Sequence, residues 1–452
     1  MSPTTRSSLA LIAAVSLAPL AARADEPAGA SAAPAPAAEE KPLAGYAGSE
    51  QFFLRSADDN FVLIPSGRMQ FDGFYFPTPT ATTPKSDLFV KRARAEVAGT
   101  FMKKFDFMLA GDFAGSSLPA YTDDWVNVAL DPLFNIQIGQ YDIPFTNENR
   151  TSDKYLDFQE RSIAVRALGI PENKGQGIMA WALAKDKAWH YSVMVFDGDG
   201  QQTRNKDSAF DWAGRAFVQP FKLMGYEGPG DRFQIGASGY TGFHHKTGLD
   251  GAKWSTQGGF TFLNANGSVT DSAKAKHAVQ LAGEGRDERH ALEVSVPFGD
   301  LELQAEFVGV EKDIAEISDG KGTGSNGRYS AKGLYVEVGY WLFGGRGVIG
   351  PNGVQAPAHL NLSKAAPTEC ALEVVAKVES AQADISLKGS SLTTIPGHYE
   401  VNAFQIGLNY WATKHLRLSG DYAFYNFGGQ STTPDKGVTQ ENELLFRAAV
   451  AL

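Results

Sequence analysis

The segment that ends the chain, residues 441–452 (ENELLFRAAVAL), restricts the possible fold more than any other part of the sequence. Read as a strand, it places the apolar side chains Leu444, Phe446, Ala448, Val450 and Leu452 on one face. Glu443 and Arg447 then lie on the other face, because successive side chains of a strand point to opposite sides. A final strand with one face for lipid and one for water is typical of a transmembrane β-barrel, in which it closes the sheet.

The start of the chain has the features of a secretory signal. A positively charged beginning is followed by an apolar stretch at residues 9–20, and Ala22-Arg23-Ala24 provides a cleavage site of small residues. We therefore expect a signal peptide over residues 1–24 and a periplasmic spacer over residues 25–45, which are rich in Ala, Pro and Glu. Residues 46–452 are assigned to a β-barrel of the bacterial outer membrane.

Composition agrees with a barrel and excludes several other classes of protein. No segment after the signal holds ~18 continuous apolar residues, so a transmembrane helix is not available. The mean hydropathy is only −0.23, as expected when polar lumen side chains alternate with lipid-facing ones. The net charge of −10 argues against nucleic acid as a partner. Cys370 is the single cysteine, so an intramolecular disulfide is excluded.

Alternating runs of apolar and polar residues recur after residue 46, separated by Gly, Pro, Asp and Asn. The predicted strands are residues 61–76, 88–101, 105–113, 123–130, 133–141, 177–184, 189–196, 210–220, 232–241, 290–297, 301–311, 329–343, 370–379, 399–411, 415–427 and 440–452. The predicted fold class is therefore all-β, an antiparallel transmembrane β-barrel of about sixteen strands with an aqueous lumen. Short turns belong on the periplasmic side and long loops outside, although residues 344–369 form a long connection predicted to be periplasmic.

The connection at residues 142–175 is long and polar, and by our count it is the third outer loop. It contains Asn147-Glu148-Asn149-Arg150 and a segment at residues 153–166 that can form a short helix. Long loops of this kind are usually functional, and loops of large barrels commonly fold inward. We therefore expect the third outer loop to fold into the barrel and to narrow its lumen.

Several motifs then occur in a characteristic order: residues 61–76 (FVLIPSGRMQFDGFYF), 89–99 (FVKRARAEVAG), 138–141 (IGQY), 144–145 (PF), 159–162 (QERS) and 405–411 (QIGLNYW). Their order and spacing resemble the phosphate-selective porins O and P over nearly the whole mature chain, except for residues 240–288. The resemblance implies a trimeric outer-membrane barrel of about sixteen strands that passes anions, phosphate or polyphosphate, through a pore lined by Arg and Lys. Arg92, Arg94 and Arg161 match family motifs position by position.

Alternation assigns directions to the side chains of the first two predicted strands. Those assigned to lipid are Leu63, Met69, Phe71, Tyr75, Phe89, Ala93, Ala95 and Val97. Those assigned to the lumen are Arg68, Gln70, Asp72, Arg92, Arg94 and Glu96. The opposite register would bury arginines at the bilayer centre at ~2–4 kcal/mol each. Lys91 is expected to point outward, where its amine can reach the headgroups.

A series of fixed cations in a narrow channel lets an anion step from one N–H donor to the next. The candidate pore-lining and anion-binding residues are Arg68, Arg92, Arg94, Arg215, Lys377, Arg417 and Arg447 on strands, with Arg150, Lys154, Arg161 and Arg166 on the third outer loop. The expected partners are permeating phosphate and chloride, outer-membrane lipid, and the barrel-assembly machinery, which would read the last strand. A homotrimer is implied only by the resemblance, and no cofactor or metal is expected.

Acidic side chains also face the lumen in this register: Asp72, Glu96, Asp106, Asp112, Asp211, Glu293, Glu302, Glu306, Glu337, Glu373, Glu379 and Asp421. They outnumber the strand cations, so anion preference does not follow from the residues alone. A basic constriction between acidic mouths would still select anions, because charges beyond ~8–10 Å are screened. If Arg92 and Arg94 instead pair with Glu96, Asp72 and Glu160, a weakly selective or cation-preferring pore results.

Two further classes of function are open. An outer-membrane hydrolase needs a Ser or Asp beside a His, but no spacing singles out any of the eight histidines. A structural or adhesion barrel, plugged by its own loops, would suit the spacer, although the spacer lacks the heptads of a coiled coil. His244-His245 and residues 197–200 (DGDG) lack the spacing of a metal site. We therefore expect a channel and not an enzyme.

Overall fold

The computed structural model describes residues 43–46, 52–80, 83–115, 120–170, 173–248, 252–265, 269–270, 278–318, 321–344, 370–389, 395–413, 415–429 and 438–451. The predicted signal peptide, most of the predicted spacer, the long connection after Gly344 and Leu452 lie outside these residues.

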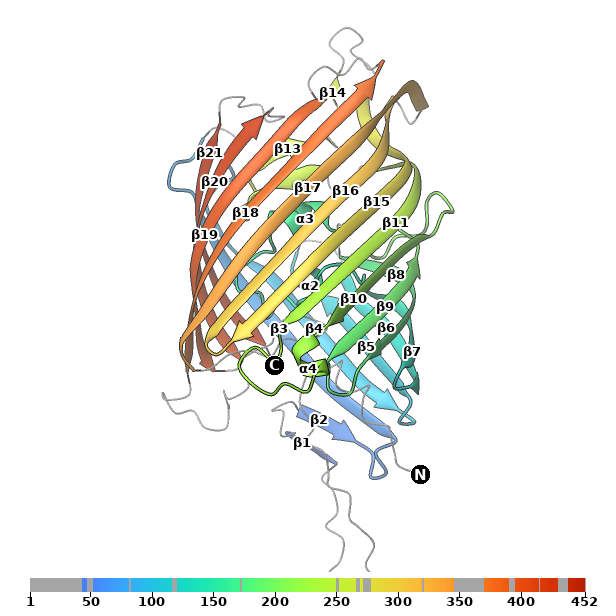
Figure 1. Cartoon of the computed structure of the whole chain (residues 1–452), viewed down its shortest axis with the longest axis vertical. Helices are drawn as coiled ribbons and strands as arrows, with labels where there is room; N and C mark the ends of the chain where they lie inside the picture. The colour runs from blue at the N-terminus through green and yellow to red at the C-terminus, as the bar shows by residue number, and fades with distance from the viewer. Residues whose placement is uncertain are drawn as a thin grey trace, which may run out of the picture.

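In the described part of the chain, sixteen antiparallel strands form one closed barrel (Figure 1). These strands are β3 (Phe61–Tyr75), β4 (Asp87–Phe101), β5 (Phe105–Asp112), β6 (Ala120–Asp131), β7 (Phe134–Asp142), β8 (Lys174–Leu183), β9 (Trp189–Phe196), β10 (Asp211–Val218), β11 (Gln234–Gly248), β15 (Ala278–Phe298), β16 (Leu301–Ser318), β17 (Lys321–Phe343), β18 (Ala371–Lys388), β19 (Gly397–Thr413), β20 (Leu416–Gly429) and β21 (Gln440–Ala451). Each pairs with the next, and β21 pairs with β3 from Leu444↔Tyr75 to Ala451↔Arg68. The last strand therefore closes the barrel, as its sequence predicts.

Smaller elements join the barrel at its ends and inside it. β1 (Ala44–Tyr46) and β2 (Phe52–Arg55) extend the sheet beside β3, and β14 (Val269–Thr270) pairs with β15. β12 (Lys253–Ser255) and β13 (Thr261–Asn264) form a separate hairpin. The helices are α2 (Asn147–Arg150), α3 (Ile163–Leu168) and α4 (Pro220–Leu223). Across the described residues, every helix is too short or too polar to cross a bilayer.

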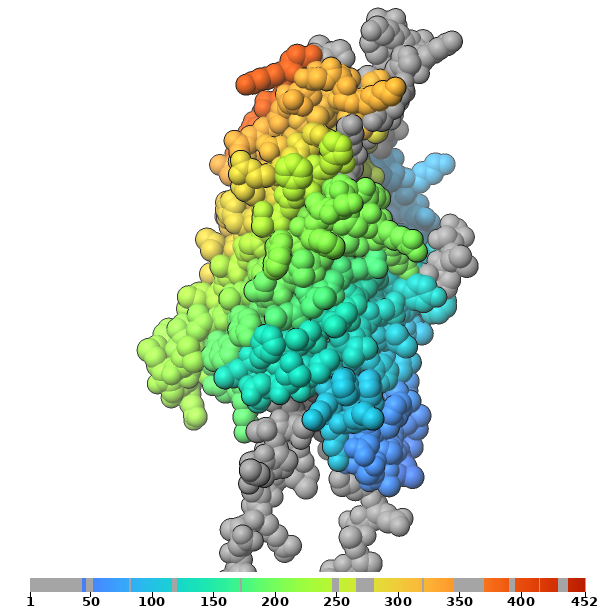
Figure 2. All heavy atoms as spheres, turned by 90° about the vertical axis from the view of Figure 1, so that its right-hand side faces the viewer, coloured from blue at the N-terminus to red at the C-terminus, as the bar shows by residue number. Residues whose placement is uncertain are grey.

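The barrel wall has two heights. Strands β5 to β10, which Figure 2 shows from outside, have 8 to 12 residues each. Strands β15, β16 and β17 have 21, 18 and 23 residues. The sequence predicts the number and order of the strands correctly but makes several of the later ones too short. Their extra length carries charged groups on the outer face, such as Arg286 and Glu288, so the apolar alternation used for the prediction ends before the strand does.

The two faces of the wall differ as the predicted register requires. On β3, Met69 and Tyr75 are 50% and 52% exposed, whereas Gln70 and Asp72 are 1% and 0% exposed. Apolar side chains therefore cover the outer face, and polar ones cover the inner face, where little of their surface is accessible.

The predicted directions of Phe89 and Lys91 are wrong, because β4 contains a β-bulge at this point. Gln70 lies opposite Arg92, but the next residue, Phe71, lies opposite Val90, so Lys91 is the extra residue. An extra residue exchanges the two faces of a strand beyond it. Phe89 therefore faces inward opposite Asp72, and the Lys91 Nζ lies 2.8 Å from Glu160 Oε1 inside the barrel.

Candidate functional site

The segment between β7 and β8 contacts inner-face side chains on the far side of the barrel. The backbone N–H groups of Asn147 and Glu148 donate to the Glu306 carboxylate of β16, both at 2.7 Å. The Ile163 N–H donates to Glu379 Oε2 of β18 at 2.5 Å. Both carboxylates thus satisfy N–H groups at helix starts that would otherwise lack partners. Figure 1 shows α2 and α3 within the outline of the barrel, and we call residues 143–170 the α2–α3 segment.

Three arginines of neighbouring strands converge on one carboxylate of this segment. Arg68 of β3 pairs with Asp153 Oδ1, while Arg92 Nε and Arg94 Nη2 of β4 lie 2.6 Å and 3.7 Å from Asp153 Oδ2. The Asp153 side chain is only 7% exposed. Burial alone would raise the pKa of Asp153, but the three guanidinium groups hold it well below its usual value. We call Arg68, Arg92, Arg94 and Asp153 the arginine cluster.

Further carboxylates surround the arginine cluster and neutralise most of its charge. Glu96 lies 3.0 Å from Arg68 and 3.2 Å from Lys154, and Asp112 lies 2.9 Å from Arg94. Glu160 pairs with Lys91 at the bulge, and although burial opposes ionisation, Lys91, Arg92 and Arg447 lower its pKa to about 2. The sequence predicts the inward direction of these arginines but not which carboxylates they contact.

Arg447 forms a buried pair at the seam of the barrel. Its Nε and Nη2 each lie 2.7 Å from an oxygen of Asp72, and both side chains are 0% exposed. The Arg447 Nη1 also donates to the Gln159 carbonyl at 2.8 Å. This pair therefore joins β21 to β3 and both to the α2–α3 segment.

The other basic residues of the α2–α3 segment mainly hold its backbone. Arg161 donates to the carbonyls of Glu148, Asn149 and Thr151. Arg150 donates to the Asp142 carbonyl, and burial lowers its pKa despite the nearby Asp142 carboxylate. The side chains of Arg150 and Arg161 were predicted to contact the ion, and in this structure they donate hydrogen bonds to backbone carbonyls instead.

The basic residues on the remaining wall are also engaged. Arg215 pairs with Glu293 at 2.6 Å and donates to Asn147 Oδ1 at 2.9 Å. The Lys377 Nζ lies 3.7 Å from Glu337 and 4.4 Å from the Phe158 ring centroid. Arg417 donates to the Leu156 carbonyl at 2.7 Å. The acids predicted to face the lumen lie on the inner face and are buried, except Asp112, which is half-buried.

The β12–β13 hairpin is a second segment inside the barrel, and the sequence gives no signal for it. Trp254 and Phe260 are 0% and 1% exposed. The Gly258 N–H donates to Glu443 Oε2 of β21 at 2.9 Å, and Arg166 of α3 donates to the Thr256 carbonyl at 2.9 Å. The hairpin lies within residues 240–288, where strands were not predicted beyond residue 241 and the resemblance fails.

The described residues offer no metal site, and the adjacent histidines His244 and His245 point in different directions. No group of three or more His, Cys, Asp or Glu in the described residues is arranged to hold a metal ion. His244 faces Asp207, Asp211 and Asp287 at 3.6 to 3.8 Å, whereas His245 pairs with Glu284 on the opposite face of β11. The two adjacent histidines therefore do not form one site.

Comparison with known proteins gives a family and a fold. The family model described as phosphate-selective porin O and P matches residues 66–449. No curated protein sequence matches the chain. Among solved structures, an anion-selective porin from Comamonas acidovorans is similar at 12% identity and a TM-score of 0.50, covering 87% of this chain and 100% of that one. The trimer form of OmpT, an outer membrane protein of Vibrio cholerae, is similar at 9% identity and a TM-score of 0.53, with the same coverage. At these identities the two structures support the barrel fold alone.

Proposed function

Because the chain belongs to the phosphate-selective porin O and P family, and is therefore an outer-membrane channel for passive diffusion, we propose that it prefers small anions such as phosphate and chloride. Flow follows the gradient, and no reaction is catalysed. The family and the barrel fold both support a channel rather than an enzyme.

The arginine cluster is the observation that carries this proposal. Its three guanidinium groups already surround an oxyanion, the Asp153 carboxylate: Arg68 and Arg92 lie in direct contact with it, and Arg94 lies 3.7 Å away as a further positive charge. Phosphate offers the same oxygen acceptors, and guanidinium forks suit both groups. We propose that the α2–α3 segment narrows the lumen at this level and that a passing anion exchanges with Asp153 for these donors.

The test is the reversal potential of the purified channel in a planar bilayer under a KCl gradient, followed by addition of phosphate. An anion-selective potential and a fall in chloride current on adding phosphate are expected. Arg92→Ala should weaken both effects. Arg286→Ala is the matched control, because Arg286 is 69% exposed on the outer face. A wild-type channel without anion selectivity would contradict the proposal.

A weakly selective or cation-preferring pore is the second candidate, and the ion pairs favour it. Such a pore was expected if Arg92 and Arg94 pair with Glu96, Asp72 and Glu160; both arginines are paired, but with Asp153 at 2.6 Å and Asp112 at 2.9 Å instead. Glu302, Glu306, Glu337 and Glu373 add buried acids on the wall formed by β16, β17 and β18. The same reversal potential distinguishes the two candidates, because only the first gives a clearly anion-selective value.

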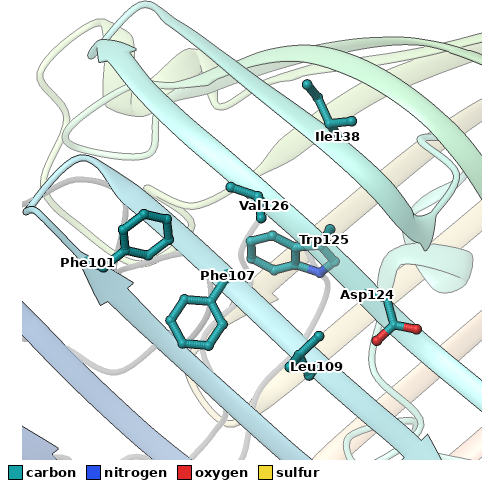
Figure 3. A pocket seen from close by; sticks show the side chains of 7 residues that line it. All are labelled: Phe101, Phe107, Leu109, Asp124, Trp125, Val126 and Ile138. Carbon is teal, nitrogen blue, oxygen red and sulfur yellow. The ribbon is translucent and has the colours of Figure 1, made fainter.

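We also propose that the channel is a homotrimer, with the wall formed by the short strands β5 to β10 at its subunit contacts. A groove of about 480 Å³ on the outer face of this wall is lined by Phe101, Phe107, Leu109, Asp124, Trp125, Val126 and Ile138 (Figure 3). Asp124 lies opposite Leu109, which is 56% exposed on the outer face. A carboxylate in an apolar outer wall is poorly suited to lipid. Asp124→Leu should leave the subunit folded but reduce the trimer fraction in detergent, measured by light scattering. Monomeric wild-type channels would contradict the proposal.

Export and assembly complete the proposal. Cleavage after Ala24 would leave residues 25–45 as a periplasmic spacer, and the barrel-assembly machinery would recognise β21 as the closing strand. Mass spectrometry of the mature chain tests the cleavage site directly.

A further inference from the structure

Four polar atoms on one patch of the inner wall have no hydrogen-bond partner among the described residues. They are Trp341 Nε1 on β17, Glu373 Oε1 on β18, Trp411 Nε1 on β19 and Arg417 Nε on β20. Their residues are 3%, 2%, 5% and 3% exposed. Buried polar groups nearly always have partners, so each exception calls for a physical explanation, and four on neighbouring strands point to a common cause.

The pairing of the strands brings these residues together. Trp341 lies opposite Glu373, and Trp411 lies opposite Arg417, whose guanidinium carbon is 5.1 Å from a Trp411 ring centroid. Trp341, Ala371 and Trp411 pack in one cluster, with Tyr155 of the α2–α3 segment against it. We call Trp341, Glu373, Trp411 and Arg417 the tryptophan patch.

The tryptophan patch lies beside the α2–α3 segment and near one end of the barrel. The Arg417 Nη1 donates to the Leu156 carbonyl, and Asn409 Nδ2 donates to the Asp157 carbonyl at 2.8 Å. The backbone N–H of Trp341, not its indole N–H, donates to the Asp300 carbonyl in the short turn between β15 and β16. The patch therefore lies between the α2–α3 segment and the end of the wall that carries this turn.

The donors and acceptors of the patch define the ligand that suits it. Two indole N–H groups and one guanidinium N–H can donate, and the Glu373 Oε1 can accept. The indole rings are flat apolar surfaces on which C–H faces pack. Anions are disfavoured because two carboxyl groups, those of Glu373 and Asp157, lie next to Gly339 beside the patch. A Cβ built on Gly339 would lie within 4 Å of both Glu373 Oε1 and Asp157 Oδ2.

We propose that the tryptophan patch is a binding subsite for a neutral polyhydroxylated solute, of the chemical class of small sugars, on its path through the channel. Hydroxyl groups both accept from the indole and guanidinium N–H groups and donate to Glu373. This inference rests on the passive-channel function but not on the preference for anions. It gives the channel two unlike surfaces, the arginine cluster for anions and the tryptophan patch for neutral solutes.

The test uses maltose as the probe and the full-length channel in planar bilayers. Maltose should lower the KCl current along a saturable curve, which an ethylene-glycol oligomer of similar size should not do. The Trp341→Phe/Trp411→Phe variant keeps the rings but removes both donors, so its maltose affinity should fall about two- to tenfold. Trp212→Phe is the matched control, because Trp212 is 53% exposed on the outer face.

Three outcomes overturn the inference: no saturable effect of maltose on the wild-type channel, the same effect with the ethylene-glycol oligomer, or an unchanged affinity in the double variant. Any of these would leave the four polar atoms to ordered water. Should the double variant fail to fold, Glu373→Leu, which removes the acceptor, provides the same comparison. The reversal potential measured in the same bilayers tests the anion proposal separately, because maltose is uncharged.

Discussion

Replacing Asp153 with Asn removes the carboxylate shared by Arg68, Arg92 and Arg94 and keeps a side chain of nearly the same shape. Glu96 and Asp112 then remain as close carboxylate partners of Arg68 and Arg94. The arginine cluster therefore gains one net positive charge without losing a strand residue. We expect the Asp153→Asn channel to pass anions over cations more strongly than the wild type.

The size of the effect follows from Coulomb's law. One unit charge at ~6 Å from an ion in a water-filled lumen contributes about 0.7 kcal/mol. Screening at ~0.1 M salt reduces this to about half. Because the sign is opposite for anions and cations, the permeability ratio changes by about twice that energy, which corresponds to about threefold.

The assay is the reversal potential under a KCl gradient, with Asp384→Asn as the matched control. Asp384 is an acid 62% exposed on the outer face of β18, where it faces His398. An unchanged reversal potential in a folded Asp153→Asn channel would refute the reasoning. It would show that permeating ions do not pass close to the arginine cluster.

Three further predictions concern the stability of the barrel, its dependence on pH, and the face of β4 to which Lys91 belongs. The Asp72→Ala variant leaves the Arg447 guanidinium buried without the Asp72 carboxylate, so the free energy of unfolding should fall by ~3–5 kcal/mol. In denaturant titrations in micelles, the double variant Asp72→Leu/Arg447→Met should show a much smaller loss. The pKa of Glu160 is lowered from 4.5 to about 2, so the stability that its ion pairs contribute is complete above about pH 4.5 and is lost as the pH falls through about 2. A difference in unfolding free energy between wild type and Glu160→Gln that shrank between pH 7 and about 5 would contradict this assignment. Lys91→Cys should react with a water-soluble thiol reagent from the lumen and Val90→Cys should not, in a background without the native cysteine; equal reactivity would contradict the bulge.

The sequence predicts the strands because the bilayer imposes one rule on all of them. Every spanning strand must show apolar side chains on one face, so the alternation in β3 and β21 is visible without any knowledge of partners. The rule loses its force where a strand leaves the apolar band, which explains the underestimated length of β15. It also fails at the β4 bulge, because one extra residue changes the face of Lys91 without changing the composition.

For the candidate site, the sequence predicts which side chains point inward but not which ion pairs they form. The inward positions of Arg68 on β3 and of Arg92 and Arg94 on β4 follow from the alternation within each strand. Asp153 has no such signal, because it lies in an irregular segment and meets its arginines only when that segment folds against β3 and β4. For the same reason the β12–β13 hairpin was missed: its apolar residues are buried inside the barrel, where alternation predicts polar groups.

The inward acids, which seemed to oppose anion passage, mostly have structural partners. Glu306 and Glu379 accept N–H groups at the starts of α2 and α3, where the helix dipole also favours a negative charge. Glu293 and Asp72 each neutralise one buried arginine. A count of lumen charges therefore does not determine the selectivity, because a charge already paired in the wall adds little field in the pore. We therefore propose that the sign of the selectivity depends on the few ion pairs in which a permeating ion can replace one partner, and the carboxylate of Asp153, shared by three arginines, is the clearest candidate for such replacement.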